Sequence, residues 1–255
     1  MLYPVFPLVG GIIAVLFVWL LGLRRFTVSG LVFGALAILF SLVVQDLLQD
    51  LPLLIALRSE LAGVTSVEEV QRVVREFLEG IGLAGVIGLC LWTGFVAGVV
   101  QTGFKYLFIS IVLWKSYRGA LSLGLSFGFT EAVIVAALAL LLASILASET
   151  TPLWMATLSG MVAAFERFSA TLFHVGTSLY IAHTANQGAA LRGVLAVTAI
   201  HGSIDTAAAI YQVGQAYQAV NTTIALAAAG TAIVATLLTG LYLTLKYRRK
   251  VLEEA

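Results

Sequence analysis

The sequence feature that most constrains this chain is residues 161–182, MVAAFERFSATLFHVGTSLYIA, an apolar run long enough to cross a lipid bilayer. Glu166, Arg167 and His174 lie inside it. A charged side chain at the centre of a membrane costs roughly 2.5–3.5 kcal/mol on insertion scales, so such residues usually face the interior of a helix bundle and have partners there. The segment therefore predicts a buried polar centre with partners on the other helices.

The composition predicts a membrane protein. Of the 255 residues, 60% are hydrophobic and only 11% are charged, against about 25% charged in soluble domains. A formal net charge of +1 gives no support for nucleic-acid binding. We expect an all-α, polytopic bundle in the lipid bilayer of a cell membrane (prokaryotic plasma membrane), with 1–255 as a single membrane domain. About 20 apolar residues make one span, which predicts seven transmembrane helices: 3–22, 27–46, 84–113, 118–147, 153–186, 191–214 and 221–246.

The basic residues predict the orientation. Cytoplasmic loops of membrane proteins are enriched in Lys and Arg. The joints at 148–152 and between the last two spans contain neither residue. We therefore expect the N-terminus outside and the C-terminus in the cytoplasm, which puts all the basic joints on one side: Arg24 and Arg25, Lys115 and Arg118, Arg192, and the basic residues of 246–250.

Residues 47–83 depart from this pattern and predict an extracytoplasmic loop with an amphipathic helix. Thr65 or Ser66 can cap the helix, apolar residues recur at helical spacing, and Gly80 suits its end. This helix is expected on the outer side, where it could lie in the membrane interface. A structural lid, a simple linker and a substrate-gating element remain alternatives for its role.

The four spans within 84–214 form the expected catalytic-type core. Because successive helices alternate in direction, five polar residues fall within about two turns of the midpoint of their span, at one level of the membrane: Gln101, Glu131, Glu166, His201 and Asp205. Residues four apart share a helix face, as do three pairs here: Gln101 and Lys105, Phe127 and Glu131, and His201 and Asp205. A structural ion pair of Glu166 with Arg167, and neutralisation of Glu131 by Lys105, remain alternatives to a functional role.

Three kinds of chemistry fit this set of residues. Two imidazoles with carboxylates can bind a divalent metal such as Zn²⁺ and leave a position for water; the candidate ligands are His174, His201, Asp205 and Glu131. Without a metal, the same groups can activate water by general base catalysis, with an amide or imidazole stabilising the oxyanion. A proton relay in a proton-coupled carrier is the third possibility.

At these residues the chain resembles the YhfC/PrsW group of intramembrane proteases, related to the wider CAAX-protease and bacteriocin-processing superfamily. Phe127-x-x-x-Glu131 matches the group's FxxxE motif, and His201-Gly-Ser-Ile-Asp205 matches its HxxxD motif. Glu166-Arg167 followed by His174 is similar to the ER…H pattern of the YhfC branch. The match covers roughly 90–210. It implies an intramembrane peptidase that hydrolyses a peptide bond of a transmembrane or membrane-proximal substrate.

The chain departs from the group at the EExxR/K motif, where it reads Gln101-Thr102-Gly-Phe-Lys105. An amide cannot replace a glutamate that activates water. Three explanations compete. The chain could be a natural pseudoenzyme that binds a membrane partner, or a form mutated to be inactive. Alternatively, Glu131 or Glu166 could supply the base, with a metal on His174, His201 and Asp205. In the active version we expect Glu131 to be the general base and Lys105 to tune its charge. Gln101 would donate a hydrogen bond to the oxyanion, and three residues would bind a metal or polarise water: His174, His201 and Asp205. Glu166 and Arg167 would support these residues.

Overall fold

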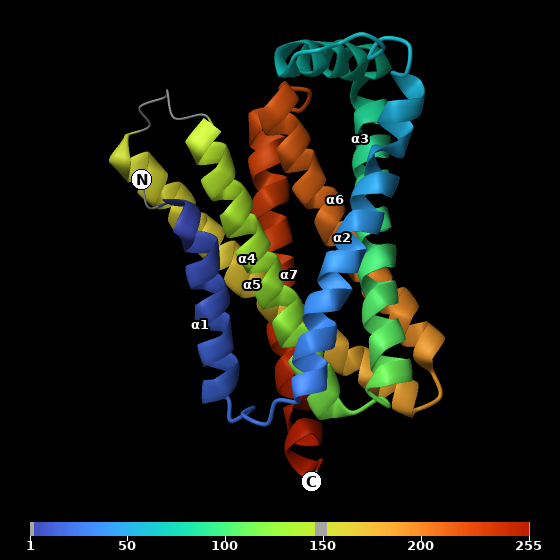
Figure 1. Ribbon diagram of the computed structural model, residues 1–255, viewed down its shortest axis with the longest axis vertical. Coiled ribbons are helices and arrows are strands. Elements are labelled where there is room, and N and C mark those ends of the chain that lie inside the picture. Colours follow the sequence, from blue (N-terminus) through green and yellow to red (C-terminus); the bar gives the residue numbers. More distant parts are fainter. Residues whose placement is uncertain (1–2, 146–151, 255) are drawn as a thin grey trace. The chain divides into compact units, whose positions relative to one another are not determined.

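The structure is a computed structural model that describes residues 3–145 and 152–254, and it is 88% helical. No strand occurs among the described residues, so the all-α class predicted from the sequence is confirmed. The expected joint at 148–152 lies outside the described residues except for Pro152. In chain order the elements are η1 (Tyr3–Val5), α1 (Phe6–Leu20), α2 (Val28–Ala56), α3 (Val67–Leu107), η2 (Phe108–Val112, a π-helix), α4 (Tyr117–Ile145), α5 (Leu153–Asn186), α6 (Ala190–Tyr217) and α7 (Thr222–Glu253) (Figure 1).

Five of the described helices are long and apolar enough to cross a membrane, which makes this a multi-pass membrane protein. They are α2, α3 continued through η2, α4, α6 and α7. Helix α1 is apolar but has only 15 residues. Helix α5 has 34 residues and contains the charged residues singled out above. Much of the loop expected at 47–83 is helical, because α2 continues to Ala56 and α3 begins at Val67.

The chain divides into two compact units. Unit 1 consists of Met1–Phe40, Gly103–Val194 and Ile233–Ala255, and unit 2 consists of Ser41–Thr102 and Leu195–Ala232. The division falls inside four helices, α2, α3, α6 and α7, so each of these helices contributes residues to both units. The expectation of a single domain over 1–255 stays a prediction.

In unit 1, α4 packs closely against α5 through two glycines. A Cβ atom at Gly124 would meet the backbone of His174 and Val175, and one at Gly128 would meet the backbone of Thr171. Small residues at four-residue spacing allow this close approach between membrane helices. The spacing alone is compatible with packing inside one bundle or in a dimer, and the structure shows that this pair packs inside unit 1.

In unit 2, α3 begins with the predicted amphipathic helix. Ser66 caps it, because its Oγ accepts a hydrogen bond from the backbone N–H of Glu69 at 3.2 Å. The helix changes direction at Gly82, whose φ of 65° and ψ of 179° are not helical. The expected end at Gly80 is therefore two residues early. Figure 1 shows the residues before Gly82 turned across the rest of α3.

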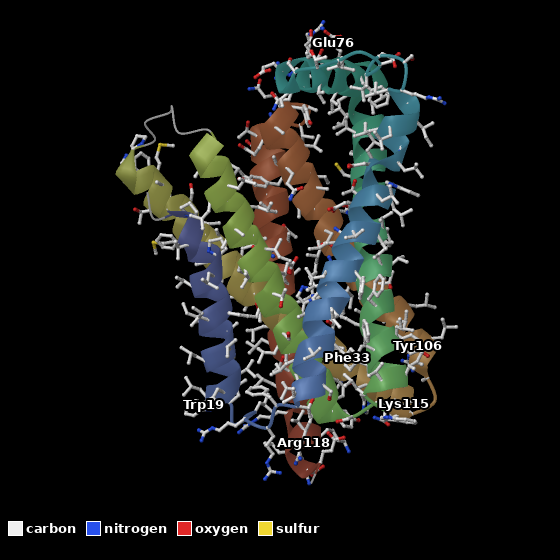
Figure 2. All side chains as sticks on the ribbon, viewed as in Figure 1. Trp19, Phe33, Glu76, Tyr106, Lys115 and Arg118 are labelled. Atoms are coloured by element: carbon white, nitrogen blue, oxygen red, sulfur yellow. The ribbon has the colours of Figure 1, made fainter. Side chains whose placement is uncertain are left out.

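The apolar side of this amphipathic helix is only partly exposed. Val74 and Leu78 are buried in an apolar cluster of unit 2 that also contains Leu57 and Val220. Glu76 lies on the exposed side (Figure 2). Protein residues therefore cover Val74 and Leu78, and the alternatives for the role of this helix stay open. The first turns remain exposed, at Val67 and Val70.

Candidate functional site

The polar centre of unit 1 is a network of five ionisable side chains from α3, α4 and α5. The Lys105 Nζ atom lies 2.6 Å from His174 Nδ1. His174 Nε2 lies 3.0 Å from Glu131 Oε2, and the same carboxylate oxygen lies 3.3 Å from Arg167 Nη1. Arg167 also pairs with Glu166 through two contacts between the guanidinium and the carboxylate. Three helices that are separate in the sequence thus contribute to one connected site.

Burial varies along this network. Lys105 is 0% exposed and His174 is 2% exposed. The Glu131 side chain is 17% exposed and the Glu166 side chain 34%. Charged groups are found this deeply buried only when they are paired. The Lys105–His174 end is therefore the closed end of the network, and Glu166 is its most accessible member.

Aromatic rings enclose the buried end. The ring centre of Phe127 lies 4.6 Å from that of His174, and the Lys105 ammonium lies 4.7 Å from the Phe127 ring centre and 5.8 Å from that of Phe173. Cation–π attraction is strongest where water is excluded. The four-residue spacing of Phe127 and Glu131 thus has a physical reason, since both side chains contact the same imidazole.

Hydrogen-bond geometry determines the roles of the two imidazole nitrogens. A protonated lysine has only donors, so Lys105 donates to Nδ1 of His174. The remaining nitrogen, Nε2, then carries the proton and donates to Glu131. With a neutral imidazole, the network contains two cations and two anions, Lys105 and Arg167 against Glu131 and Glu166. A balanced set of charges is the arrangement that limits the cost of burying ions.

The close packing of α4 on α5 explains how Glu131 reaches its partners. Arg167 and His174 are seven residues apart, close to two helical turns, and so lie on one face of α5. Thr171 lies between them and packs against Gly128 of α4. At that point the two backbones approach closely enough for Glu131, three residues after Gly128, to contact both side chains.

The remaining predicted site residues belong to unit 2. His201 Nε2 lies 3.3 Å from Asp205 Oδ2 along α6, as their spacing predicts. The Gln101 side chain donates from Nε2 to Gln45 Oε1 of α2 at 2.9 Å, and Gln45 in turn donates to Gln49 at 3.3 Å. Unit 2 thus pairs an imidazole with a carboxylate on one helix and joins α2 to α3 through amides.

The predicted site residues are thus divided between the two units. Unit 1 contains Lys105, Glu131, Glu166, Arg167 and His174, and unit 2 contains Gln101, His201 and Asp205. The prediction that all eight form one site stays a prediction. Sequence reasoning missed Gln45, which is uncharged and lies outside the four expected core spans. It also missed Thr177, whose hydroxyl lies 3.4 Å from Lys105 Nζ.

The expected zinc ligands do not form a matching set among the described residues. No three His, Cys, Asp or Glu side chains in that part of the chain are grouped so that they could hold a metal ion. In unit 1, a cation already occupies the position beside His174 Nδ1, and Nε2 already contacts Glu131. In unit 2, His201 and Asp205 supply two ligands, fewer than the three protein ligands typical of catalytic zinc.

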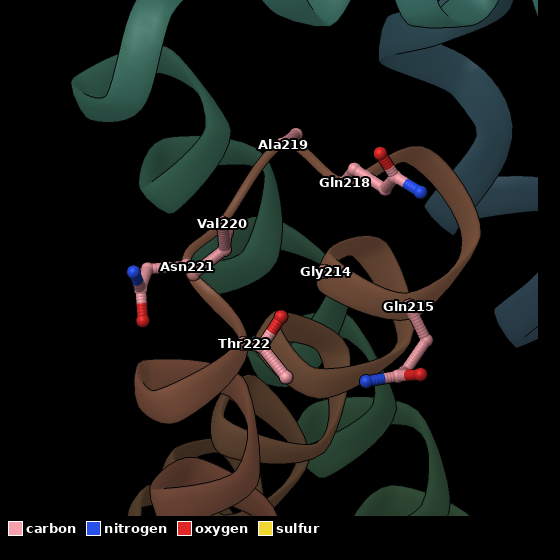
Figure 3. Close-up of a pocket in the computed structure, with 7 residues that line it drawn as sticks. All are labelled: Gly214, Gln215, Gln218, Ala219, Val220, Asn221 and Thr222. Atoms are coloured by element: carbon pink, nitrogen blue, oxygen red, sulfur yellow. The ribbon is translucent and has the colours of Figure 1, made fainter.

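Two cavities lie in unit 2, and neither is lined by a predicted site residue. One has a volume of about 500 Å³ at the turn between α6 and α7 (Figure 3), lined by Gly214, Gln215, Gln218, Ala219, Val220, Asn221 and Thr222. The other, of about 210 Å³, is lined by Leu48, Trp92, Phe95, Val96, Val99 and Val100. The candidate site is therefore described by its side-chain network.

Comparisons of the chain with protein-family models, with curated proteins and with solved structures each found no match.

Proposed function

We propose that this chain is an intramembrane peptidase of the YhfC/PrsW type, which hydrolyses a peptide bond of a membrane-embedded or membrane-proximal substrate. The proposal rests on His174, which is buried between the Lys105 ammonium and the Glu131 carboxylate. A histidine that one carboxylate orients, with its other nitrogen beside a second polar group, is an arrangement that hydrolases use for general base catalysis.

The geometry favours His174 over Glu131 as the general base. Glu131 Oε2 already accepts hydrogen bonds from His174 and Arg167, so we assign this carboxylate the role of orienting the imidazole. In the proposed reaction, substrate binding moves the Lys105 ammonium off Nδ1 and water takes its place. Nδ1 removes a proton from the water while the water oxygen attacks the peptide carbonyl carbon. Lys105 then stabilises the oxyanion that forms. When this tetrahedral intermediate collapses, the peptide C–N bond breaks and the protonated imidazole returns its proton from Nδ1 to the leaving amine nitrogen.

The proposal includes seven membrane spans, with the N-terminus outside and the C-terminus in the cytoplasm. In this proposal α1 and α5 also cross the membrane, and together with the five helices that are long and apolar enough to span it they make up the seven spans. The orientation is supported by contacts between the basic segments of unit 1: Asn186, six residues before Arg192, donates to the backbone carbonyl of Lys115 at 2.9 Å, and Glu254 accepts from the backbone of Arg118 at 2.7 Å. Grouped basic segments are typical of a cytoplasmic surface. The amphipathic start of α3 then lies outside.

The test is cleavage of a transmembrane model peptide with a fluorophore and a quencher, reconstituted with the purified protein in liposomes. We expect His174→Ala to lower the cleavage rate at least ~100-fold, the lower range for loss of a general base. The matched control is His183→Ala on the same helix, a histidine that contacts Tyr117 and lies outside the network. Equal rates for the two variants would contradict the assignment.

A second candidate function is that of a catalytically inactive homologue that binds a transmembrane partner. It is favoured by Gln101, which stands where the related proteases have a glutamate and whose amide is bonded to Gln45 of α2. An amide in this position can serve helix packing but cannot act as the general base that activates water. No cleavage by the wild type, followed by cleavage in the double variant Gln101→Glu with Thr102→Glu, would favour this candidate over the first.

A further inference from the structure

The ends of three membrane-length helices, α2, α4 and α7, meet in unit 1. The start of α2 contacts the start of α4, where the Thr27 N–H donates to Ser122 Oγ at 2.8 Å. The end of α7 contacts the same place, because Glu254 accepts from the backbone N–H groups of Tyr117 and Arg118 at 3.1 Å and 2.7 Å. Since α2, α4 and α7 are all able to span a membrane, their common end lies at a membrane surface.

This end has an excess of positive charge. Residues 21–27, 113–118 and 246–254 include two glutamates, and both are engaged: Glu253 pairs with Arg249 at 2.5 Å, and Glu254 binds the start of α4. Against these, the three segments contain eight basic residues: Arg24, Arg25, Lys115, Arg118, Lys246, Arg248, Arg249 and Lys250. A cluster of four to eight basic residues beside membrane helices attracts anionic lipid headgroups.

Arg118 adds a specific feature to this general charge. Its Nε and Nη2 atoms are buried and have no hydrogen-bond partner among the described residues. These two N–H groups lie on the same edge of the guanidinium, the edge that binds two oxygens of a phosphate or carboxylate at once. Buried donors without an acceptor are costly, and an anion with two oxygens would satisfy both of these donors at once. Glu254 does not supply it, because its oxygens accept from Ser116, Tyr117 and the Arg118 backbone and form no hydrogen bond with Nε or Nη2.

The surroundings of Arg118 are those of the lipid–water boundary. Trp114 is 86% exposed, and Arg24 stacks over the Trp19 ring at 4.0 Å; tryptophan is enriched at this depth of a membrane. Apolar side chains at the same end, Leu20 and Val28, are 70% and 78% exposed and need a cover that acyl chains provide. Figure 2 shows Trp19, Lys115 and Arg118 toward this end of the unit.

We propose that Arg118 binds the phosphate of an anionic phospholipid, with the neighbouring basic segments adding long-range attraction. The phosphate accepts from Nε and Nη2, and the acyl chains run along the exposed apolar residues of α1 and α2. This lipid site is independent of the proposed peptidase activity and goes beyond general embedding in the bilayer.

The test is a lipid titration of the full-length protein purified in a neutral detergent, with the unfolding temperature as the readout. We expect phosphatidylglycerol to raise that temperature saturably and phosphatidylcholine to leave it nearly unchanged. Arg118→Gln should weaken the apparent affinity for phosphatidylglycerol about tenfold, the loss expected for charged hydrogen bonds. The control is Arg72→Gln, an exposed arginine on α3 that should retain wild-type affinity.

Two results would overturn the proposal. If Arg118→Gln retained wild-type affinity for phosphatidylglycerol, the attraction would come from the basic segments in general. If inorganic phosphate gave the same stabilisation, the site would be one for a free anion. Should Arg118→Gln fail to fold, Arg118→Lys keeps the charge but cannot form the two-fold contact. We expect the affinity of Arg118→Lys for phosphatidylglycerol to be weakened nearly as much as that of Arg118→Gln. An affinity equal to that of the wild type would again contradict the site.

Discussion

The polar side chains of unit 1 and those of unit 2 satisfy their hydrogen bonds in different ways. In unit 1, charged groups from three helices contact one another, and Glu131 and His174 are 43 residues apart in the sequence. In unit 2, His201 and Asp205 pair along a single helix. The contact there between two helices is made by the neutral side chains Gln101 and Gln45. Buried charges thus occur where several helices can neutralise them.

This difference has an energetic consequence. Removing one charge from the unit 1 network leaves its largely buried partners as uncompensated ions, which is strongly destabilising. Removing one amide from the unit 2 pair leaves a neutral polar group, for which the penalty is much smaller. The two units should therefore respond to matched substitutions with very different losses of stability, and the predictions below test that contrast.

The largest effect is expected for Arg167→Met. The substitution leaves the carboxylates of Glu131 and Glu166 without their shared cation. We expect the free energy of unfolding to fall by about 3–5 kcal/mol, the range for breaking a buried ion pair. The measurement is reversible denaturation of the purified protein in detergent, followed by circular dichroism.

The control for this prediction is Arg72→Met in unit 2. Arg72 forms an exposed pair with Glu76 at 3.7 Å, and exposed pairs typically contribute no more than about 1 kcal/mol. A loss for Arg167→Met as small as that of the control would mean that the unit 1 network contributes nothing specific, and the contrast between the units would be wrong.

A smaller effect is expected from crowding the α4–α5 contact with Gly124→Val. An ideal Cβ at this position lies 2.7 Å from the Val175 Cα atom, so the helices must separate. We expect a loss of about 1–3 kcal/mol, the usual cost of overpacking. The matched control is Gly88→Val on α3, since nothing lies within 4 Å of a Cβ there. Equal losses for the two variants would show that the close α4–α5 approach is unimportant.

The sequence predicted the helical class, the shared faces and the buried polar centre, because these follow from apolar length and from spacing along one helix. It did not predict which residues pair across helices. A direct neutralisation of Glu131 by Lys105 was one expectation, yet the imidazole of His174 lies between them. Spacing determines the face of a helix that a residue occupies, whereas the neighbour on another helix depends on how the two helices are rotated against each other.

The end of the amphipathic helix shows the same limit at a smaller scale. Gly80 and Gly82 are two residues apart and both suit a helix end by composition. Only Gly82 has the positive φ of a break. The choice follows from packing, because ending the helix at Gly82 keeps Val74 and Leu78 in the apolar cluster of unit 2 with Ile81 packed beside them. Such tertiary contacts outweigh local preference and are not visible in a sequence pattern.

The smallest effect is expected for Gln101→Leu in unit 2. The variant removes the hydrogen bond to Gln45, and hydrogen bonds between membrane helices contribute about 0.6 kcal/mol on average. We therefore expect a loss of roughly that size in the same unfolding measurement, with Thr102→Val as the neighbouring control. If Gln101→Leu instead lost as much as Arg167→Met, Gln101 would belong to a charged network of its own. The second candidate function, in which this amide only joins α2 to α3, would then lose its basis.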